Sequence, residues 1–127
     1  MAVKADDNNS TAILCVYYVD GSTKWIVDLQ LKCIEQYSKR YDYTIYACIT
    51  KGDVWLTDKL QSQDHLVLLE AESESRNPSK QHGDSLTLLF DAAKQQGHNM
   101  IVTLDMDSFP INSNWLLDMR QQLLPPM

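Results

Sequence analysis

This sequence of 127 residues has no concentrated positive charge. Its 11 Lys and Arg are outnumbered by 17 Asp and Glu, which gives a formal net charge of −6, and no basic cluster occurs. Binding to nucleic acid needs Lys and Arg gathered against the phosphates, so we expect no nucleic-acid partner. An anionic small molecule would need a local device instead, such as a metal ion or a helix N-terminus.

Long apolar segments and a cysteine framework are also lacking. No run approaches the ~20 apolar residues of a membrane span, and residues 1–10 are polar and acidic, unlike a secretory signal. Cys15, Cys33 and Cys48 form no CxxC pair and lie among apolar neighbours, which predicts buried, reduced thiols. We therefore expect a cytoplasmic protein without a membrane span and with a disordered N-terminus over residues 1–10.

The remaining residues, 11–127, contain no repeat and no linker, so they are expected to form a single domain. Apolar, β-branched runs alternate with segments of helical periodicity. This alternation predicts an α/β fold, a Rossmann-like, mostly parallel sheet flanked by helices. The expected strands are 12–18, 44–50, 65–69 and 100–104, and the expected helices are 24–40, 54–60, 82–96 (opened by His82-Gly83-Asp84-Ser85) and 114–124.

Ligands of open parallel sheets bind at the carboxyl ends of the strands. Three loops of this sequence meet that condition, at residues 17–21, 50–53 and 105–108, and acids, hydroxyls and glycines are concentrated there. The segment 70–81, which contains Asn77-Pro78, is expected to be a further loop, long enough to be functional.

Asp105 and Asp107 are the most informative residues in these loops. Two carboxylates directly after an apolar strand are costly unless something neutralises them, and a hard divalent cation does so. In an extended strand, side chains at i and i+2 share a face, so both could reach one Mn²⁺ or Mg²⁺ ion. The alternative is that the two aspartates are simply solvated at a strand-to-loop turn.

The segment Leu104-Asp105-Met106-Asp107-Ser108-Phe109-Pro110 resembles the strand-end DxD motif of GT-A-fold glycosyltransferases, in particular family-2-like members. Lys80-Gln81-His82-Gly83-Asp84-Ser85-Leu86 resembles the helix start that precedes the motif in that family. Their order and spacing also agree. The resemblance implies the nucleotide-sugar-binding half of a GT-A enzyme, with a UDP-sugar as the favoured ligand.

By that resemblance, a nucleotide-diphosphate sugar would be held by side chains from all of these loops. The first loop would sandwich the base, a later acid would bind the base edge, and basic residues would neutralise phosphate. Asp105 would contact ribose or metal, and Asp107 would ligate the metal. The implied nucleotide-binding residues are Tyr17, Tyr18, Val19, Asp53, Arg76, Lys80, His82, Gly83, Asp105 and Met106. Structural roles compete: core packing for the tyrosines, solvated loop charges for Arg76 and Lys80, and a helix-start hydrogen bond for His82.

The sequence departs from the family after the motif. GT-A enzymes usually continue well beyond it, and that second half supplies acceptor contacts and, in inverting members, the catalytic base. Only about twenty residues follow Asp107 here, and the sole acid among them, Asp118, is expected to face solvent. The sequence therefore names no catalytic base and no acceptor. We expect weak nucleotide-sugar hydrolysis beside any transfer, and a homo-oligomer that covers the open sheet edge.

Other classes share parts of this pattern. Haloacid-dehalogenase-type phosphatases and lesion-bypass polymerases carry similar Asp-x-Asp strings, but on early strands with much of their machinery downstream. A non-catalytic nucleotide or nucleotide-sugar binding module is the stronger alternative, followed by an α/β domain with no ligand. Binding and catalysis would use the same Asp-x-Asp, so the sequence does not separate them.

Overall fold

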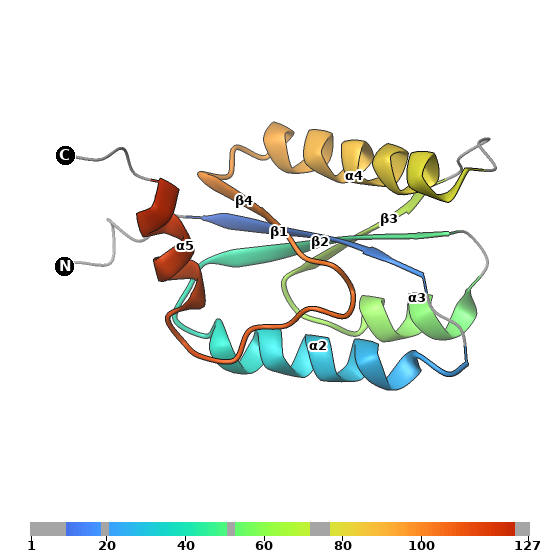
Figure 1. Ribbon diagram of the computed structural model, residues 1–127, viewed down its shortest axis with the longest axis horizontal. Coiled ribbons are helices and arrows are strands. Elements are labelled where there is room, and N and C mark those ends of the chain that lie inside the picture. The colour runs from blue at the N-terminus through green and yellow to red at the C-terminus, as the bar shows by residue number, and fades with distance from the viewer. Residues whose placement is uncertain (1–9, 19–20, 51–52, 72–76, 124–127) are drawn as a thin grey trace.

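The computed structural model describes residues 10–18, 21–50, 53–71 and 77–123. Four strands form one sheet in the order β3-β2-β1-β4 (Figure 1). Every neighbouring pair is parallel, so the carboxyl ends of all four strands lie at one edge. The strands are β1 (Thr11–Tyr17), β2 (Tyr43–Thr50), β3 (Leu66–Ala71) and β4 (Met100–Thr103).

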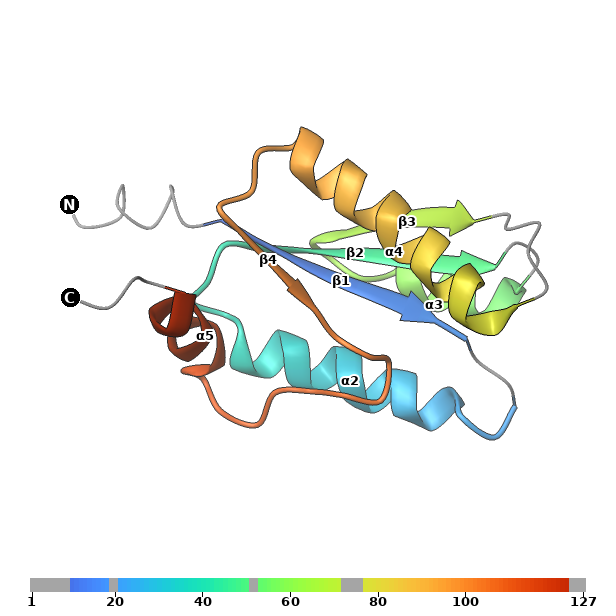
Figure 2. The same cartoon turned by 45° about the horizontal axis from the view of Figure 1, so that its top comes forward.

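Helices cover both faces of the sheet. Helix α4 lies over one face, whereas α2 and α3 lie over the other, and α5 packs near the amino ends of the strands (Figures 1 and 2). The helices are α2 (Lys24–Tyr37), α3 (Val54–Gln61), α4 (Pro78–Gln95) and α5 (Trp115–Leu123). The predicted α/β, Rossmann-like class is thereby confirmed. None of the described helices combines the length and apolar character needed to cross a bilayer.

Strand β1 is buried along its whole length, as its continuous apolar run predicts. Successive side chains of a strand point to opposite faces. Ile13, Cys15 and Tyr17 accordingly join the core beneath α2 and α3, whereas the alternate residues Leu14 and Val16 join the core beneath α4. This alternation decides which residues near the carboxyl edge are buried and which reach the ligand side.

The buried face of α2 does not include all of its apolar residues. Leu29 is 36% exposed and Cys33 is only half-buried, so the expectation of a buried thiol is wrong at Cys33, whereas Cys15 and Cys48 are buried. The stripe that packs on the sheet is Val27, Gln30, Leu31 and Ile34, which is the i, i+3, i+4, i+7 pattern of one helix face. The polar side chain of Gln30 hid this stripe in the sequence.

Helix α4 begins earlier than predicted. Its N-cap is Asn77, whose side-chain oxygen accepts hydrogen bonds from the backbone N–H groups of Ser79 (2.9 Å) and Lys80 (3.4 Å). Pro78 occupies the first helical position, where its lack of an N–H costs nothing. The expected helix start at His82 is therefore wrong, because Asn77-Pro78 is a helix-start signal rather than a loop signal. The expected loop over 70–81 is wrong at residues 70–71, which end β3, and at 78–81, which begin α4, whereas residues 72–76 lie outside the described residues.

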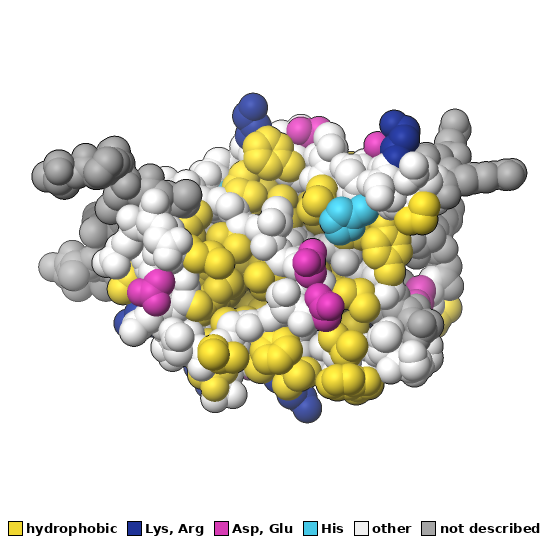
Figure 3. Space-filling model, viewed as in Figure 1, with side chains coloured by type: hydrophobic (Ala, Val, Ile, Leu, Met, Phe, Trp, Pro, Cys, Tyr) yellow, Lys and Arg dark blue, Asp and Glu magenta, His cyan; other side chains and the backbone are white. Residues whose placement is uncertain are grey.

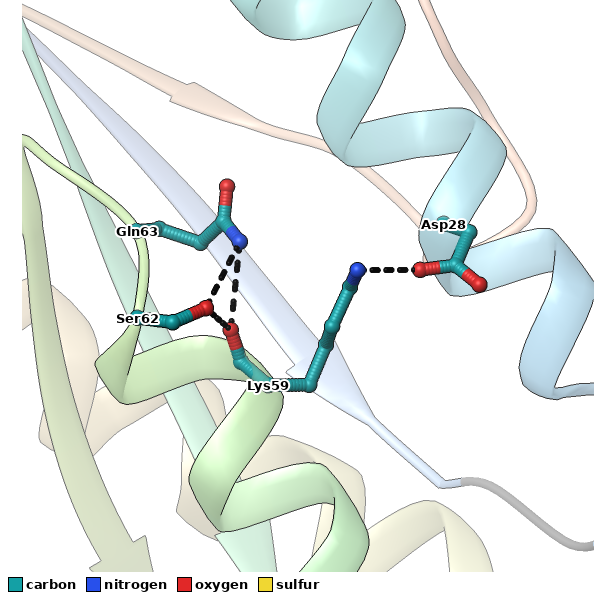
Figure 4. Close-up of polar contacts among 4 residues, drawn as sticks. All are labelled: Asp28, Lys59, Ser62 and Gln63. Carbon is teal, nitrogen blue, oxygen red and sulfur yellow. Dashed lines mark hydrogen bonds and ion pairs between the residues drawn. The ribbon is translucent and has the colours of Figure 1, made fainter.

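Helices α2 and α3 are joined on the surface of their layer. Lys59 of α3 makes an ion pair with Asp28 of α2, with 2.5 Å between Nζ and Oδ1 (Figure 4). The Lys24 ammonium lies over the Trp55 ring, 5.0 Å from its centroid. Since both partners of the ion pair are about one third exposed, it contributes at most about 1 kcal/mol. Its effect is to fix one helix beside the other.

Candidate functional site

The order of the strands changes direction at β1. From β1 the chain moves to β2 and then β3 on one side, and β4 returns to the other side of β1. The switch point therefore lies between the carboxyl ends of β1 and β4, and the segment after β4 runs along α2 toward α5 (Figure 2). Such a topological switch point is where open α/β sheets bind their ligands.

The Asp-x-Asp segment lies at this switch point as a tight turn. Strand β4 ends at Thr103, and the Leu104 N–H still donates to the Leu14 carbonyl of β1 (2.9 Å). The Ser108 N–H then donates to the Asp105 carbonyl (2.9 Å), which closes a four-residue turn. The expected extended conformation is therefore wrong at Asp107. Asp105 is the first residue of the turn, a position where aspartate is common for structural reasons alone.

Both carboxylates nevertheless face solvent. Asp105 and Asp107 are exposed, and within the described parts of the chain no hydrogen bond or ion pair engages either side chain. Figure 3 shows acidic side chains and a histidine close together near the middle of this face, with hydrophobic side chains around them. The turn thus presents two negative charges that form no ion pair with any Lys, Arg or His among the described residues.

A buried amide supports the turn from below. Gln30 of α2 is fully buried, and its Nε2 donates to the carbonyls of Asp105 (3.0 Å) and Ser108 (3.2 Å). Its Oε1 accepts a hydrogen bond from the Tyr17 hydroxyl at 2.5 Å. Sequence reasoning missed Gln30. The signal that could have found it is its position within the apolar stripe Val27, Leu31, Ile34, because a polar residue there must find partners inside.

Tyr18 and Met106 connect the two loops of the switch point. The Tyr18 N–H donates to the Met106 sulfur at 3.3 Å. The Tyr18 ring contacts His82 of α4, with 6.4 Å between ring centroids and 35° between the planes. Tyr18 is 44% exposed, so much of this ring is available to a ligand. The structure thus brings together Tyr18, His82, Met106 and the aspartate turn.

Tyr17 does not lie on the ligand side, and its expected role in stacking on a base is corrected. It is 1% exposed, because β1 directs it with Cys15 into the core beneath α2. Burial raises the pKa of its hydroxyl well above the ordinary value, with Cys15 adding to the effect. The hydroxyl therefore stays protonated and serves as the donor to Gln30.

The other expected ligand contacts have mixed placements. His82 and Gly83 lie inside α4 rather than at its start, so their backbone N–H groups belong to the helix. A phosphate contact by the His82 side chain stays a prediction. Asp53 caps α3, with its Oδ1 accepting from the Leu56 N–H at 3.0 Å. Lys80 is exposed in the first turn of α4. Val19 and Arg76 lie outside the described residues.

The donor set at the turn fits one particular kind of metal site. Carboxylate oxygens are hard donors of the type that Mg²⁺ and Mn²⁺ prefer. Among the described residues, no group of three or more His, Cys, Asp or Glu side chains could hold an ion. An ion at Asp105 and Asp107 would have at most two carboxylate ligands here and would need phosphate oxygens or water for the rest. This matches a metal that binds together with a diphosphate.

Comparison with solved structures identifies a similar fold. The chain superposes with a TM-score of 0.60 and 14% identity on the crystal structure of a "putative nucleotide-diphospho-sugar transferase" from Desulfovibrio desulfuricans G20. The match covers 90% of this chain but 54% of the other, so this chain spans about half of that protein's length. No family model and no curated protein matches the sequence. At this identity the likeness shows a shared fold.

Proposed function

We propose that this chain binds a nucleotide-diphosphate sugar through a divalent metal at Asp105 and Asp107, as the nucleotide-sugar-binding part of a GT-A-like glycosyltransferase. A UDP-sugar with Mn²⁺ or Mg²⁺ is the favoured pair. The observation that carries the proposal is the pair of exposed carboxylates, without a partner among the described residues, on a turn at the switch point of the sheet.

Three groups of residues have separate roles in binding the ligand. Asp105 and Asp107 supply the negative charge that holds the cation, and the cation in turn neutralises the diphosphate. The exposed ring of Tyr18 stacks on the base, with His82 behind it. Hydrogen bonds between the turn and Gln30 of α2 hold the two carboxylates at the switch point between β1 and β4. The fold of a protein named as a nucleotide-sugar transferase supports this assignment, and phosphate contacts by Arg76 and Lys80 or a base contact by Asp53 remain predictions.

The chemistry offered by the metal is electrostatic. A bound divalent ion offsets the negative charge that develops on a departing nucleoside diphosphate. The chain's own residues bind and orient the donor for that departure. Transfer to an acceptor, or to water, is the activity that this arrangement would serve.

Calorimetric titration with UDP tests the proposal. Wild-type protein is expected to bind UDP with Mn²⁺ present and to bind far more weakly in EDTA. Asp107→Asn keeps the size of the side chain but removes its charge, and should weaken the Mn²⁺-dependent affinity at least about tenfold, ~1.4 kcal/mol. Asp118→Asn, an exposed acid on α5, is the matched control and should bind normally. Equal affinity with and without metal would reject the proposal.

A non-catalytic binding module is the second candidate. Among the described residues, no group of three or more His, Cys, Asp or Glu side chains could hold a metal ion, and no side chain near the two aspartates is assigned as a catalytic base. Turnover of a labelled UDP-sugar, with and without Mn²⁺, separates the two candidates. Release of free sugar or of a transferred product supports an enzyme, and metal-dependent binding without any turnover supports a module.

A further inference from the structure

The only hydrogen bonds that the structure gives between the aspartate turn and α2 come from one side chain, Gln30, among the residues described. The amide nitrogen has two hydrogens, and its acceptors are the carbonyls of Asp105 at 3.0 Å and Ser108 at 3.2 Å and, more weakly, the Cys15 sulfur at 3.5 Å. These carbonyls belong to the first and last residues of the turn. One amide group therefore holds the turn at both ends. Asp105 is the first of the two bonded residues, and Asp107 lies between them.

The orientation of this amide is determined by its other contacts. Because carbonyls can only accept, the nitrogen end must face the turn and the oxygen end must face away from it. The oxygen end meets the Tyr17 hydroxyl at 2.5 Å, which is a donor there. Rotating the amide by 180° would set oxygen against two carbonyls and leave the hydroxyl without its acceptor. The two carbonyls thus select the orientation, and the Tyr17 hydroxyl supplies the donor for the buried oxygen end of the amide.

Burial makes this arrangement rigid. Gln30 is 0% exposed and Tyr17 is 1% exposed, so water cannot replace either partner. A buried polar group without a hydrogen-bond partner destabilises the fold by more free energy than a surface hydrogen bond contributes. Helix α2 itself is held by Val27, Leu31 and Ile34 in the main core. The position of the turn is therefore tied to the helix and the sheet rather than to the loop alone.

We propose that Gln30 is the positioning residue of the Asp105–Ser108 turn, and that the Tyr17 hydroxyl, by donating to the buried oxygen of its amide, holds that amide where both aspartates are presented at the switch point. The effect of this support on ligand affinity rests on the proposed function. The structural part does not, because the hydrogen bonds hold the turn with or without a ligand. A side chain that only fills space at position 30 would leave the turn unsupported.

Hydrogen exchange of the backbone amides tests the structural part. In Gln30→Met, which keeps the length but removes the donors, the Ser108 amide is expected to exchange at least tenfold faster than in wild type. The amides of Ile45 and Ala47 in β2 should exchange at the wild-type rate. Gln36→Met, an exposed position on the same helix, is the matched control and should change neither. An unchanged Ser108 rate in folded Gln30→Met would overturn the proposal.

A second variant covers the case in which Gln30→Met does not fold. Tyr17→Phe keeps the ring in the core but removes the hydroxyl, so the buried Oε1 of Gln30 loses its donor and the amide is held less firmly. The Ser108 amide should again exchange several-fold faster. If Tyr17→Phe is folded and leaves that rate unchanged, the proposal fails.

Affinity for UDP with Mn²⁺ tests the functional part. In folded Gln30→Met it should fall at least tenfold, while Gln36→Met binds like wild type. If wild-type protein shows no metal-dependent binding, the proposed function fails, and the exchange rates still decide whether Gln30 positions the turn. If wild type binds and Gln30→Met binds equally well despite faster exchange at Ser108, the positioning role in ligand binding is refuted.

Discussion

Shortening Leu89 to alanine should remove a large part of the stability of this domain. Leu89 is fully buried and is the large α4 side chain in the core between that helix and the sheet. The substitution removes three carbons, which at ~0.8 kcal/mol each gives a transfer cost of about 2.4 kcal/mol. The cavity left behind adds ~1–2 kcal/mol when the surroundings cannot close in. The sheet below is fixed by the β1–β2 ladder, so we expect a total near 3–5 kcal/mol.

Leu88→Ala is the matched control, because it makes the same change on the same helix at a side chain that is 38% exposed. Its cost should stay below about 1 kcal/mol. Urea unfolding followed by circular dichroism gives both values, and an unchanged m-value shows that only stability has changed. A Leu89→Ala cost no larger than that of Leu88→Ala would refute the description of α4 as the cover of this sheet face.

Three further predictions concern other contacts. Burial raises the pKa of the Cys15 thiol to about 11 from 9.0. This thiol should leave the free energy of unfolding unchanged below pH 9 and lower it by about 1.4 kcal/mol per pH unit between pH 9 and 11, because only the unfolded chain ionises there. Urea unfolding at pH 8 to 10 should show that the free energy of unfolding falls less steeply in Cys15→Ala. Asp53→Ala should cost about 1 kcal/mol through loss of the α3 cap, whereas Asp53→Asn should cost little; equal losses in urea unfolding would contradict a capping role. Trp115→Phe should cost about 1–3 kcal/mol, since it leaves the buried Ser38 hydroxyl without the indole donor at 3.0 Å; a thermal midpoint equal to wild type would count against that bond.

Much of the fold could be predicted from the sequence because two of its strands, β1 and β2, are buried on both faces. The runs in β1 and β2 are continuously apolar, which is typical only of such strands, and each is followed by a helical segment. Gly97, with its φ of 76°, follows the C-cap of α4 near the predicted helix end, in the conformation that glycine adopts without strain. Local chemistry was therefore sufficient for the order of the elements.

The site was less predictable, because it depends on contacts between residues far apart in the chain. Gln30 lies 75 positions from Asp105, and no local pattern states that its amide will meet that turn. The burial of Tyr17 beside the exposed Tyr18 depends on where β1 ends, and a shift of one residue would exchange their environments. The spacing of Asp105 and Asp107 indicated a candidate metal site. It did not indicate the conformation of the segment, because a turn and a strand end have similar sequences.

Paramagnetic broadening by Mn²⁺ tests the central claim most directly. Substoichiometric Mn²⁺ added to protein with UDP should first weaken the backbone amide signals of Tyr18, Met106 and Asp107, which lie at the switch point. Tyr43, at the amino end of β2, should keep its signal. Asp107→Asn should abolish the selective loss. Broadening centred elsewhere, or identical in Asp107→Asn, would contradict a metal–nucleotide site at the aspartate turn.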